Sequence, residues 1–267
     1  MVKLEGNIKK MKASNISKIQ YSMVLSDNIF PINQYIGRNI SLIWNKIIYC
    51  VKCGNKTKKS FFQGFCYPCF INAPESSECI LRPELCQAHE GISRDMEWSK
   101  NHCLSDHFVY LSLTSGVKVG VTRYTQIPTR WIDQGAIKAL KIAKTPNRYL
   151  AGMIEIQLKK FVSDRTSWQK MLKNDVDQSI DLYQYRETLK KNISNSLKQY
   201  VLDEEKELLI NYPVDCYPQK IKSINFDKVG EFDGTLTGMK GQYLYLDNEY
   251  VVNIRKYSGY FFKILIN

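Results

Sequence analysis

The chain has few acidic side chains, few histidines and no long apolar run. Its 267 residues contain 26 Asp and Glu against 38 Lys and Arg, so the formal net charge is +12. No apolar stretch approaches the roughly 20 residues that a membrane-spanning helix needs. Residues 1–6 also lack the apolar core of an export signal. We therefore expect a cytoplasmic protein with no membrane partner.

The excess of positive charge favours a polyanionic partner. Each phosphate that a cationic side chain neutralises releases counterions, and this release drives association with nucleic acid. A solvated basic surface without a specific partner would explain the same charge. On composition alone, nucleic acid is one of two open interpretations.

Two Cys-x-x-Cys pairs separated by twelve residues form a metal-binding motif. Two residues between thiolates let both sulfurs reach one tetrahedral ion, and a glycine beside each pair suits the tight turn. A redox-active pair would begin a helix in a βαβ unit, and neither pair does so. The spacing predicts a structural zinc ribbon with the ligands Cys50, Cys53, Cys66 and Cys69.

The other cysteines of this region predict a second zinc site. Seven of the eight cysteines lie between Cys50 and Cys103, and all three histidines fall in the same part of the chain. Buried thiols without a metal are the competing interpretation. Four protein ligands would leave no position for water, so both ions would be structural. The expected ligands are Cys79, Cys86, Cys103 and His107, with His89 as the alternative fourth ligand.

A strand pair downstream of the cysteines carries several polar side chains. Residues 107–113 and 117–123 alternate around a Ser-Gly turn, as in a β-hairpin. Gly120 would let a backbone or a phosphate approach the sheet closely. On a later helix, which we expect to begin at Thr145 as its cap, Glu155 lies at the edge of the apolar stripe. A carboxylate there needs a cation or an arginine as its partner.

These residues could hydrolyse a phosphodiester, which requires an activated water and a cation that offsets charge on the phosphorus. Glu155 could hold Mg²⁺ or Mn²⁺ through oxygen. Arg130 or Arg123 could clamp the phosphate. Tyr110 and Lys118 could orient or deprotonate the water. Taken singly, each residue has a plainer interpretation: a strand aromatic, an exposed lysine or an ion-paired glutamate.

Residues 107–172 resemble the GIY-YIG nuclease superfamily. The resemblance implies an α+β core with a three-stranded antiparallel sheet and flanking helices. Phe108 stands in place of the first glycine, Lys118 in place of the second tyrosine as in a Lys-Ile-Gly branch, and Asn174 is the candidate for the late asparagine. The first tyrosine, the glycine, the arginine and the metal-binding glutamate of that superfamily match Tyr110, Gly120, Arg130 and Glu155.

The whole chain also resembles an uncharacterised bacterial family of unknown function. The resemblance runs from the first Cys-x-x-Cys-Gly, through Gln-Ile-Pro-Thr-Arg-Trp-Ile-Asp-Gln-Gly-Ala at residues 126–136, to Asn-Ile-Arg-Lys-Tyr at residues 253–257. It implies no particular activity.

The two ends of the chain are β-rich and similar to each other. Residues 6–11 resemble residues 234–239, and Tyr-Ile-Gly at 35–37 resembles Tyr-Ser-Gly at 257–259. Chance similarity between β-rich segments is the alternative to a repeat whose copies pair with each other. The expected organisation is an N-terminal β segment (1–47), a zinc-binding segment (48–106), a GIY-YIG-like module (107–178), a helical connector (179–212) with one helix over about 179–209, and a C-terminal β segment (213–267).

We therefore expect a zinc-stabilised α+β protein that cleaves nucleic acid, either DNA or RNA. It would bind one or two structural Zn²⁺ and a catalytic Mg²⁺ or Mn²⁺. One alternative is a zinc-containing nucleic-acid-binding protein that does not cleave. The other is a zinc-stabilised module for protein interactions.

Overall fold

The computed structural model describes residues 1–14 and 17–267, which form two compact α+β units. One unit contains residues 1–72 and 211–267, and the other contains residues 73–210. Residues 15 and 16, within the expected N-terminal β segment, lie outside the described residues. The boundary after residue 72 passes through the expected zinc-binding segment 48–106. Among the described residues, no helix has the length and apolar character that crossing a bilayer requires.

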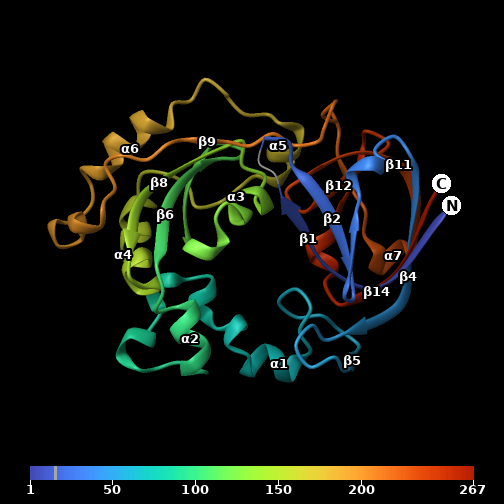
Figure 1. Ribbon diagram of the computed structural model, residues 1–267, viewed down its shortest axis with the longest axis horizontal. Coiled ribbons are helices and arrows are strands. Elements are labelled where there is room, and N and C mark those ends of the chain that lie inside the picture. Colours follow the sequence, from blue (N-terminus) through green and yellow to red (C-terminus); the bar gives the residue numbers. More distant parts are fainter. Residues whose placement is uncertain (15–16) are drawn as a thin grey trace. The chain divides into compact units, whose positions relative to one another are not determined.

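The first unit is built on one large sheet, and Figure 1 labels its strands β1, β2, β4, β5, β11, β12 and β14. The strand order is β10-β13-β12-β11-β4-β14-β1-β2-β3, and β5 pairs with β4. Burial alternates along β14, where Phe262, Ile264 and Ile266 are buried and the residues between them are partly exposed. This period of two gives the sheet a buried face. The strands are β1 (Val2–Ser14), β2 (Gln20–Leu25), β3 (Asn28–Pro31), β4 (Asn39–Tyr49), β5 (Lys56–Thr57), β10 (Lys222–Ser223), β11 (Glu231–Lys240), β12 (Tyr243–Leu246), β13 (Tyr250–Asn253) and β14 (Tyr260–Ile266), and the helices are α1 (Tyr67–Asn72) and α7 (Phe226–Val229).

The strand order of this sheet is similar on the two sides of its central pair, β4 and β14, except that β10 extends one side. Strands β11, β12 and β13 continue outward on one side in the order that β1, β2 and β3 take on the other. Equivalent hydrogen bonds recur in both halves. Gly37 N donates to Leu236 O at 2.7 Å, and Gly259 N donates to Ile8 O at 2.8 Å. The N-terminal and C-terminal β segments therefore exchange corresponding backbone hydrogen bonds.

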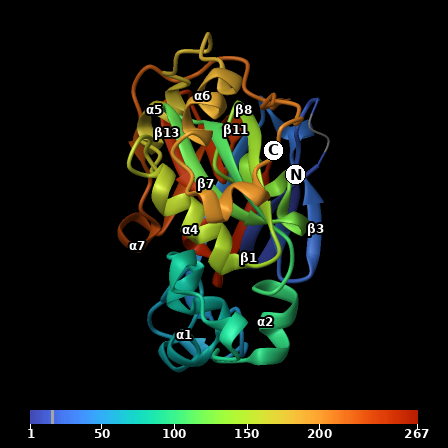
Figure 2. The same ribbon diagram turned by 90° about the vertical axis from the view of Figure 1, so that its left-hand side faces the viewer.

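The second unit contains an antiparallel sheet in the order β7-β6-β8-β9, with one strand more than the sequence predicts. Its core lies between one sheet face and helices α4 and α6 (Figure 2). Val109 of β6, Ile154 of α4 and Leu189 of α6 are among the buried residues of this core. Helix α3 brings Trp131 against Tyr110, with ring centroids 5.8 Å apart. The elements are α2 (Met96–His102), β6 (His107–Leu113), β7 (Val117–Arg123), α3 (Thr129–Asp133), β8 (Lys138–Thr145), α4 (Arg148–Leu158), α5 (Trp168–Lys173), α6 (Leu182–Lys190) and β9 (Leu208–Leu209).

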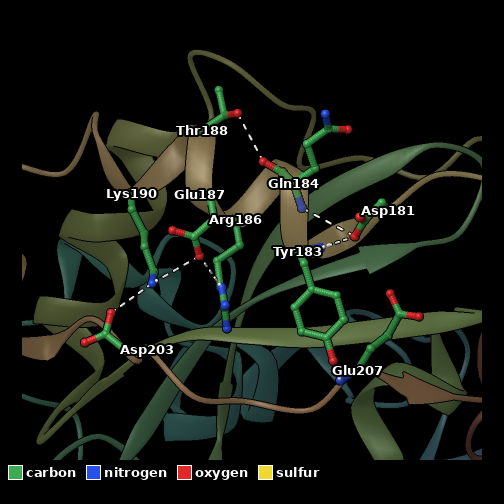
Figure 3. Close-up of polar contacts among 9 residues, drawn as sticks. All are labelled: Asp181, Tyr183, Gln184, Arg186, Glu187, Thr188, Lys190, Asp203 and Glu207. Carbon is green, nitrogen blue, oxygen red and sulfur yellow. Dashed lines mark hydrogen bonds and ion pairs between the residues drawn. The ribbon is translucent and has the colours of Figure 1, made fainter.

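The expectation of one helix over residues 179–209 is wrong. Helix α6 ends at Lys190, and the chain then follows the edge of β8, where Leu202 N donates to Ile142 O at 2.7 Å. The open backbone groups of this edge strand compete successfully with helix propagation. Polar contacts join α6 to residues 203–207. Lys190 Nζ lies 2.9 Å from Asp203, and Tyr183 Oη accepts from Glu207 N at 2.8 Å (Figure 3).

The expected cap at Thr145 is also wrong. Thr145 is the last residue of β8, and its Oγ1 donates to Asn147 O at 2.9 Å. The side chain of Asn147 accepts from Leu150 N and begins α4. Asparagine takes this role because its short side chain reaches the free N–H groups of the first turn.

Candidate functional site

Four cysteines of the first unit form a group that could hold a zinc ion. The sulfurs of Cys50, Cys53, Cys66 and Cys69 all lie within 4.8 Å of one another. Those of Cys53 and Cys66 are 3.8 Å apart, which is about the separation of two thiolates bound at 2.3 Å to a tetrahedral zinc. Burial raises the pKa of Cys50, but backbone N–H groups of the two knuckles outweigh it and lower that pKa to about 6. A hydrogen bond with Cys66 raises the pKa of Cys69 to about 12. The fit to zinc therefore rests on the four sulfurs and their spacing.

Three cysteines of the second unit form a similar group. The sulfurs of Cys79, Cys86 and Cys103 also lie within 4.8 Å of one another. The neighbouring thiols Cys79 and Cys86 lower the pKa of Cys103. Cys86 and Cys103 are buried, and Trp98 and Tyr149 pack against them. This group could also bind zinc, with a fourth ligand from elsewhere.

Neither histidine expected as the fourth ligand belongs to the three-cysteine group. The Nδ1 atom of His107 lies 2.7 Å from Ser105 O, while its Nε2 is buried without a hydrogen-bond partner among the described residues. The ring of His89 stacks on Tyr149 at 4.3 Å instead. The assignment of His107 or His89 as the fourth zinc ligand therefore stays a prediction.

Alternation along the hairpin of β6 and β7 puts Tyr110, Ser112, Lys118 and Gly120 on one face of the sheet. Tyr110 pairs with Gly120, and Ser112 pairs with Lys118, and residues two apart share a face. A Cβ on Gly120 would lie 2.7 Å from Tyr110 Oη. The glycine thus makes room for the tyrosine side chain, not for the backbone or phosphate that the sequence suggests.

Tyr110 is connected to Arg130 through Gln134, a residue that the sequence analysis did not select. The Tyr110 hydroxyl, which is fully buried, lies 2.9 Å from the Gln134 amide. When that amide is oriented to satisfy both neighbours, its oxygen accepts from Arg130 Nε at 3.2 Å and its nitrogen donates to Tyr110. Burial raises the pKa of Tyr110. The phenol therefore keeps its proton at neutral pH and can orient an oxygen atom rather than act as a base.

Lys118 is the group of this cluster that can lose a proton near neutral pH. The side chain is only 6% exposed, and its Nζ lies 3.4 Å from Thr166 Oγ1. Burial, and then repulsion from Arg130, lowers its pKa to about 8. An amine of this strength suits the removal of a proton from water. The interpretation of Lys118 as an exposed strand lysine is wrong.

Glu155 presents a buried carboxylate from α4. The residue is 6% exposed, and Lys159 Nζ forms an ion pair with its Oε2 at 3.4 Å. That oxygen accepts no well-directed hydrogen bond among the described residues. Burial raises the pKa of Glu155, and Lys159 offsets part of the shift. The charge of Glu155 also acts on both Tyr110 and Lys118, so the three groups share one electrostatic environment.

Arg123 lies in a different part of the second unit. It pairs with His107 across the hairpin, on the sheet face opposite to Tyr110. Burial, and then the charge of Arg148, lowers the pKa of Arg123, while the charge of Cys103 opposes this shift. Tyr110 and Lys118 thus both lie within the electrostatic influence of Arg130 and Glu155, whereas the charges that act on Arg123 are those of Arg148 and Cys103.

Two carboxylates that the sequence analysis did not select lie near Glu155. Asp164 forms an ion pair with Lys159 at 3.3 Å. One side-chain oxygen of Glu84 is buried without a hydrogen-bond partner among the described residues. Burial raises the pKa of Glu155 most, and the charges of Asp164 and Glu84 raise it further. No motif relates these positions, because they meet only through tertiary packing.

Comparison with protein families finds one match, which covers residues 37–262. The matching family is described as "Protein of unknown function (DUF2797)". The match includes both cysteine groups and the residues Tyr110, Lys118, Arg130 and Glu155. Searches among curated proteins and among solved structures returned no significant match.

Proposed function

We propose that this chain, which belongs to the DUF2797 family, hydrolyses phosphodiester bonds of nucleic acid with a divalent cation at Glu155. The observation that carries the proposal is the convergence of ionisable groups in one buried cluster of the second unit. Lys118 and Glu155 are both 6% exposed, and Arg130 acts electrostatically on Tyr110 and Lys118. Burying such groups is costly unless they are paired or hydrogen-bonded, and ionisable groups with shifted pKa values are concentrated at functional sites.

Each residue has one role in this proposal. Glu155 would hold Mg²⁺ or Mn²⁺, because hard cations prefer carboxylate oxygen; the cation would supply Lewis-acid stabilisation of the phosphate. Lys118 would accept the proton of the attacking water. Arg130 would bind phosphate oxygens and offset the charge that develops on them. Tyr110, held by Gln134, would orient the water or a phosphate oxygen.

The resemblance to GIY-YIG nucleases supports the same chemistry. That pattern implies a tyrosine, an arginine and a metal-binding glutamate in this order, here Tyr110, Arg130 and Glu155. The replacement of the second tyrosine by Lys118 is consistent with a lysine of lowered pKa as the base. We assign no catalytic role to Arg123, because the charges that act on it are those of Arg148 and Cys103. The zinc groups are structural in this proposal, because the four cysteines of the first group leave no open position and the three cysteines of the second are completed by a predicted histidine ligand, His107 or His89.

Cleavage assays on purified protein test the proposal. Labelled single-stranded DNA, duplex DNA and RNA are incubated with Mg²⁺ or Mn²⁺, and initial rates are compared between wild type and Glu155→Gln. We expect the variant to lose on the order of 100-fold or more, as when one preorganised catalytic group is removed. Lys118→Arg keeps the charge but cannot deprotonate, so it should be similarly slow.

Glu204→Gln is the matched control, because Glu204 is an exposed glutamate of the same unit. This variant should cleave at the wild-type rate. Equal rates in wild type and Glu155→Gln would exclude the proposed site. Salt-sensitive binding without cleavage by the wild type would overturn hydrolysis and favour a non-cleaving nucleic-acid-binding protein. Absence of both binding and cleavage would favour a protein-interaction module.

A further inference from the structure

The first unit contains a groove of about 680 Å³ beside the four-cysteine group. This volume lies within the range of about 300–1,000 Å³ that is typical of ligand sites. One wall comes from β4 and β14, and another comes from the chain between the two Cys-x-x-Cys pairs. The remaining lining residues belong to the end of β13, the turn that follows it, and α7.

The charged side chains that line this groove are mostly cationic. Lys58, Lys59, Arg255 and Lys256 contribute positive charge, and Asp227 is the anionic residue among the described lining residues. Asp227 accepts a hydrogen bond from Tyr260 Oη at 3.0 Å, so part of its hydrogen-bonding capacity is used within the wall. The groove therefore attracts anions.

Aromatic side chains form part of the same wall. Trp44 and Tyr260 contact each other with ring centroids 5.0 Å apart. Trp44 is half-buried, and both rings line the groove. Its indole N–H donates to Ile47 O at 3.2 Å, which fixes the plane of the ring. A fixed aromatic ring flanked by cations is an arrangement that recognises a nucleotide by stacking and by phosphate contacts.

We propose that this groove binds single-stranded nucleic acid, with a base against Trp44 and neighbouring phosphates at Lys58, Lys59 and Lys256. A duplex offers its phosphates but keeps its bases stacked on one another, so it cannot use the aromatic wall. An acidic peptide can meet the cations but has no planar ring for the indole. The site shares no residue with the cluster around Glu155, and its existence does not depend on cleavage there.

Zinc bound at the four-cysteine group would fix the shape of this groove. Lys58, Lys59 and Gln63 lie in the thirteen-position step from Cys53 to Cys66, so the two metal knuckles hold both ends of this segment. Arg255 Nε donates to Gln63 Oε1 and connects the segment to the opposite rim. Removal of zinc should therefore abolish binding in the groove as well as destabilise the knuckles.

Fluorescence anisotropy with a labelled oligothymidylate of about ten nucleotides tests the proposal at several salt concentrations without a divalent cation. We expect Lys58→Ala/Lys59→Ala to weaken binding at least tenfold. The slope of log affinity against log salt should fall by about 0.7 for each lost phosphate contact. Trp44→Ala should weaken binding on the order of tenfold, while Trp44→Phe, which keeps an aromatic ring, should retain most of it.

Lys12→Ala/Lys220→Ala removes the same charge from exposed positions of the same unit that do not line the groove, and should change affinity less than twofold. Equal loss in this control and in Lys58→Ala/Lys59→Ala would overturn the proposal. Equally tight binding of duplex DNA, of polyglutamate or of a single nucleotide would also overturn it, in favour of a general anion site. A chain that binds the oligonucleotide here but never cleaves would leave this inference intact and exclude only the proposed hydrolysis.

Discussion

Lys240 shows how one buried charge can set the pH dependence of stability. It is fully buried in the first unit, and its Nζ lies 5.0 Å and 5.4 Å from the ring centroids of Tyr217 and Tyr212. Burial lowers its pKa from 10.5 to about 7, because removal from water disfavours the charged ammonium. Between these two pH values the unfolded chain binds more protons than the folded chain, so the free energy of unfolding rises with pH.

Lys240→Met should remove this dependence. We expect the free energy of unfolding of the wild type to rise between pH 7 and 9 relative to that of Lys240→Met, by at most about 1.4 kcal/mol per pH unit. Urea titrations at a series of pH values measure the difference. Lys220→Met, at an exposed position, is the control and should follow the wild type. Parallel pH profiles for the wild type and Lys240→Met would contradict the shifted pKa.

Helix α4 shows how a single element positions the proposed site. Its buried face carries Ala151, Ile154 and Leu158 into the core, and the same packing buries Glu155. The other contact of α4 is with the short turn at residues 83–85, where a Cβ on Gly152 would overlap the backbone of Glu84. The close approach of helix and turn brings two carboxylates of distant sequence position together.

Gly152→Ala has two opposing effects on the free energy of unfolding, and they differ in magnitude. Alanine would favour the helix by about 1 kcal/mol, but its methyl group would force apart two packed backbones, which costs about 1–3 kcal/mol or more. Since backbone atoms cannot rotate away, we expect the cost to win and the Tm to fall by several degrees. Gly116→Ala is the control, since a Cβ there meets no atom within 4 Å. A thermal melt with unchanged or higher Tm for Gly152→Ala would show that α4 and the turn can separate without loss.

At the scale of the whole molecule, each compact unit has its own cysteine group. The group at Cys50 lies in residues 1–72, and the group at Cys79 lies in residues 73–210. The chain leaves the first unit after residue 72 and returns at residue 211, so the second unit is an insertion between two halves of the first. A metal in each unit would stabilise each fold separately.

We expect two zinc ions per chain by elemental analysis. Cys53→Ser/Cys66→Ser and Cys86→Ser/Cys103→Ser should each retain about one, because each pair removes ligands from one unit only. Cys216→Ser should retain two, since Cys216 is exposed and belongs to neither group. Loss of both ions in either double variant would contradict independent sites, and a wild type without zinc would exclude both.

The sequence by itself determined the features that depend on nearby residues. Cysteines three positions apart can lie on one turn, and alternation along 107–123 places Tyr110 and Gly120 on one sheet face, because both follow from local backbone geometry. The net charge of +12 follows from the composition alone and does not depend on the fold. These local rules were sufficient for the two Cys-x-x-Cys turns and for the hairpin, but not for the group of Cys79, Cys86 and Cys103, whose members are 7 to 24 positions apart.

Only the tertiary structure decided which side chains meet and how water surrounds them. Gln134 reaches Tyr110 across 24 positions, and Glu84 acts on Glu155 although no spacing rule relates them. The helix ends at Lys190 because the chain after it pairs with the edge of β8. Helical periodicity in the sequence cannot reveal such a pairing. Burial moves the pKa of Lys118 to about 8, and burial depends on atoms contributed by the whole unit. Local geometry follows from consecutive residues, but desolvation and contact follow from the packing of segments that are far apart in the sequence.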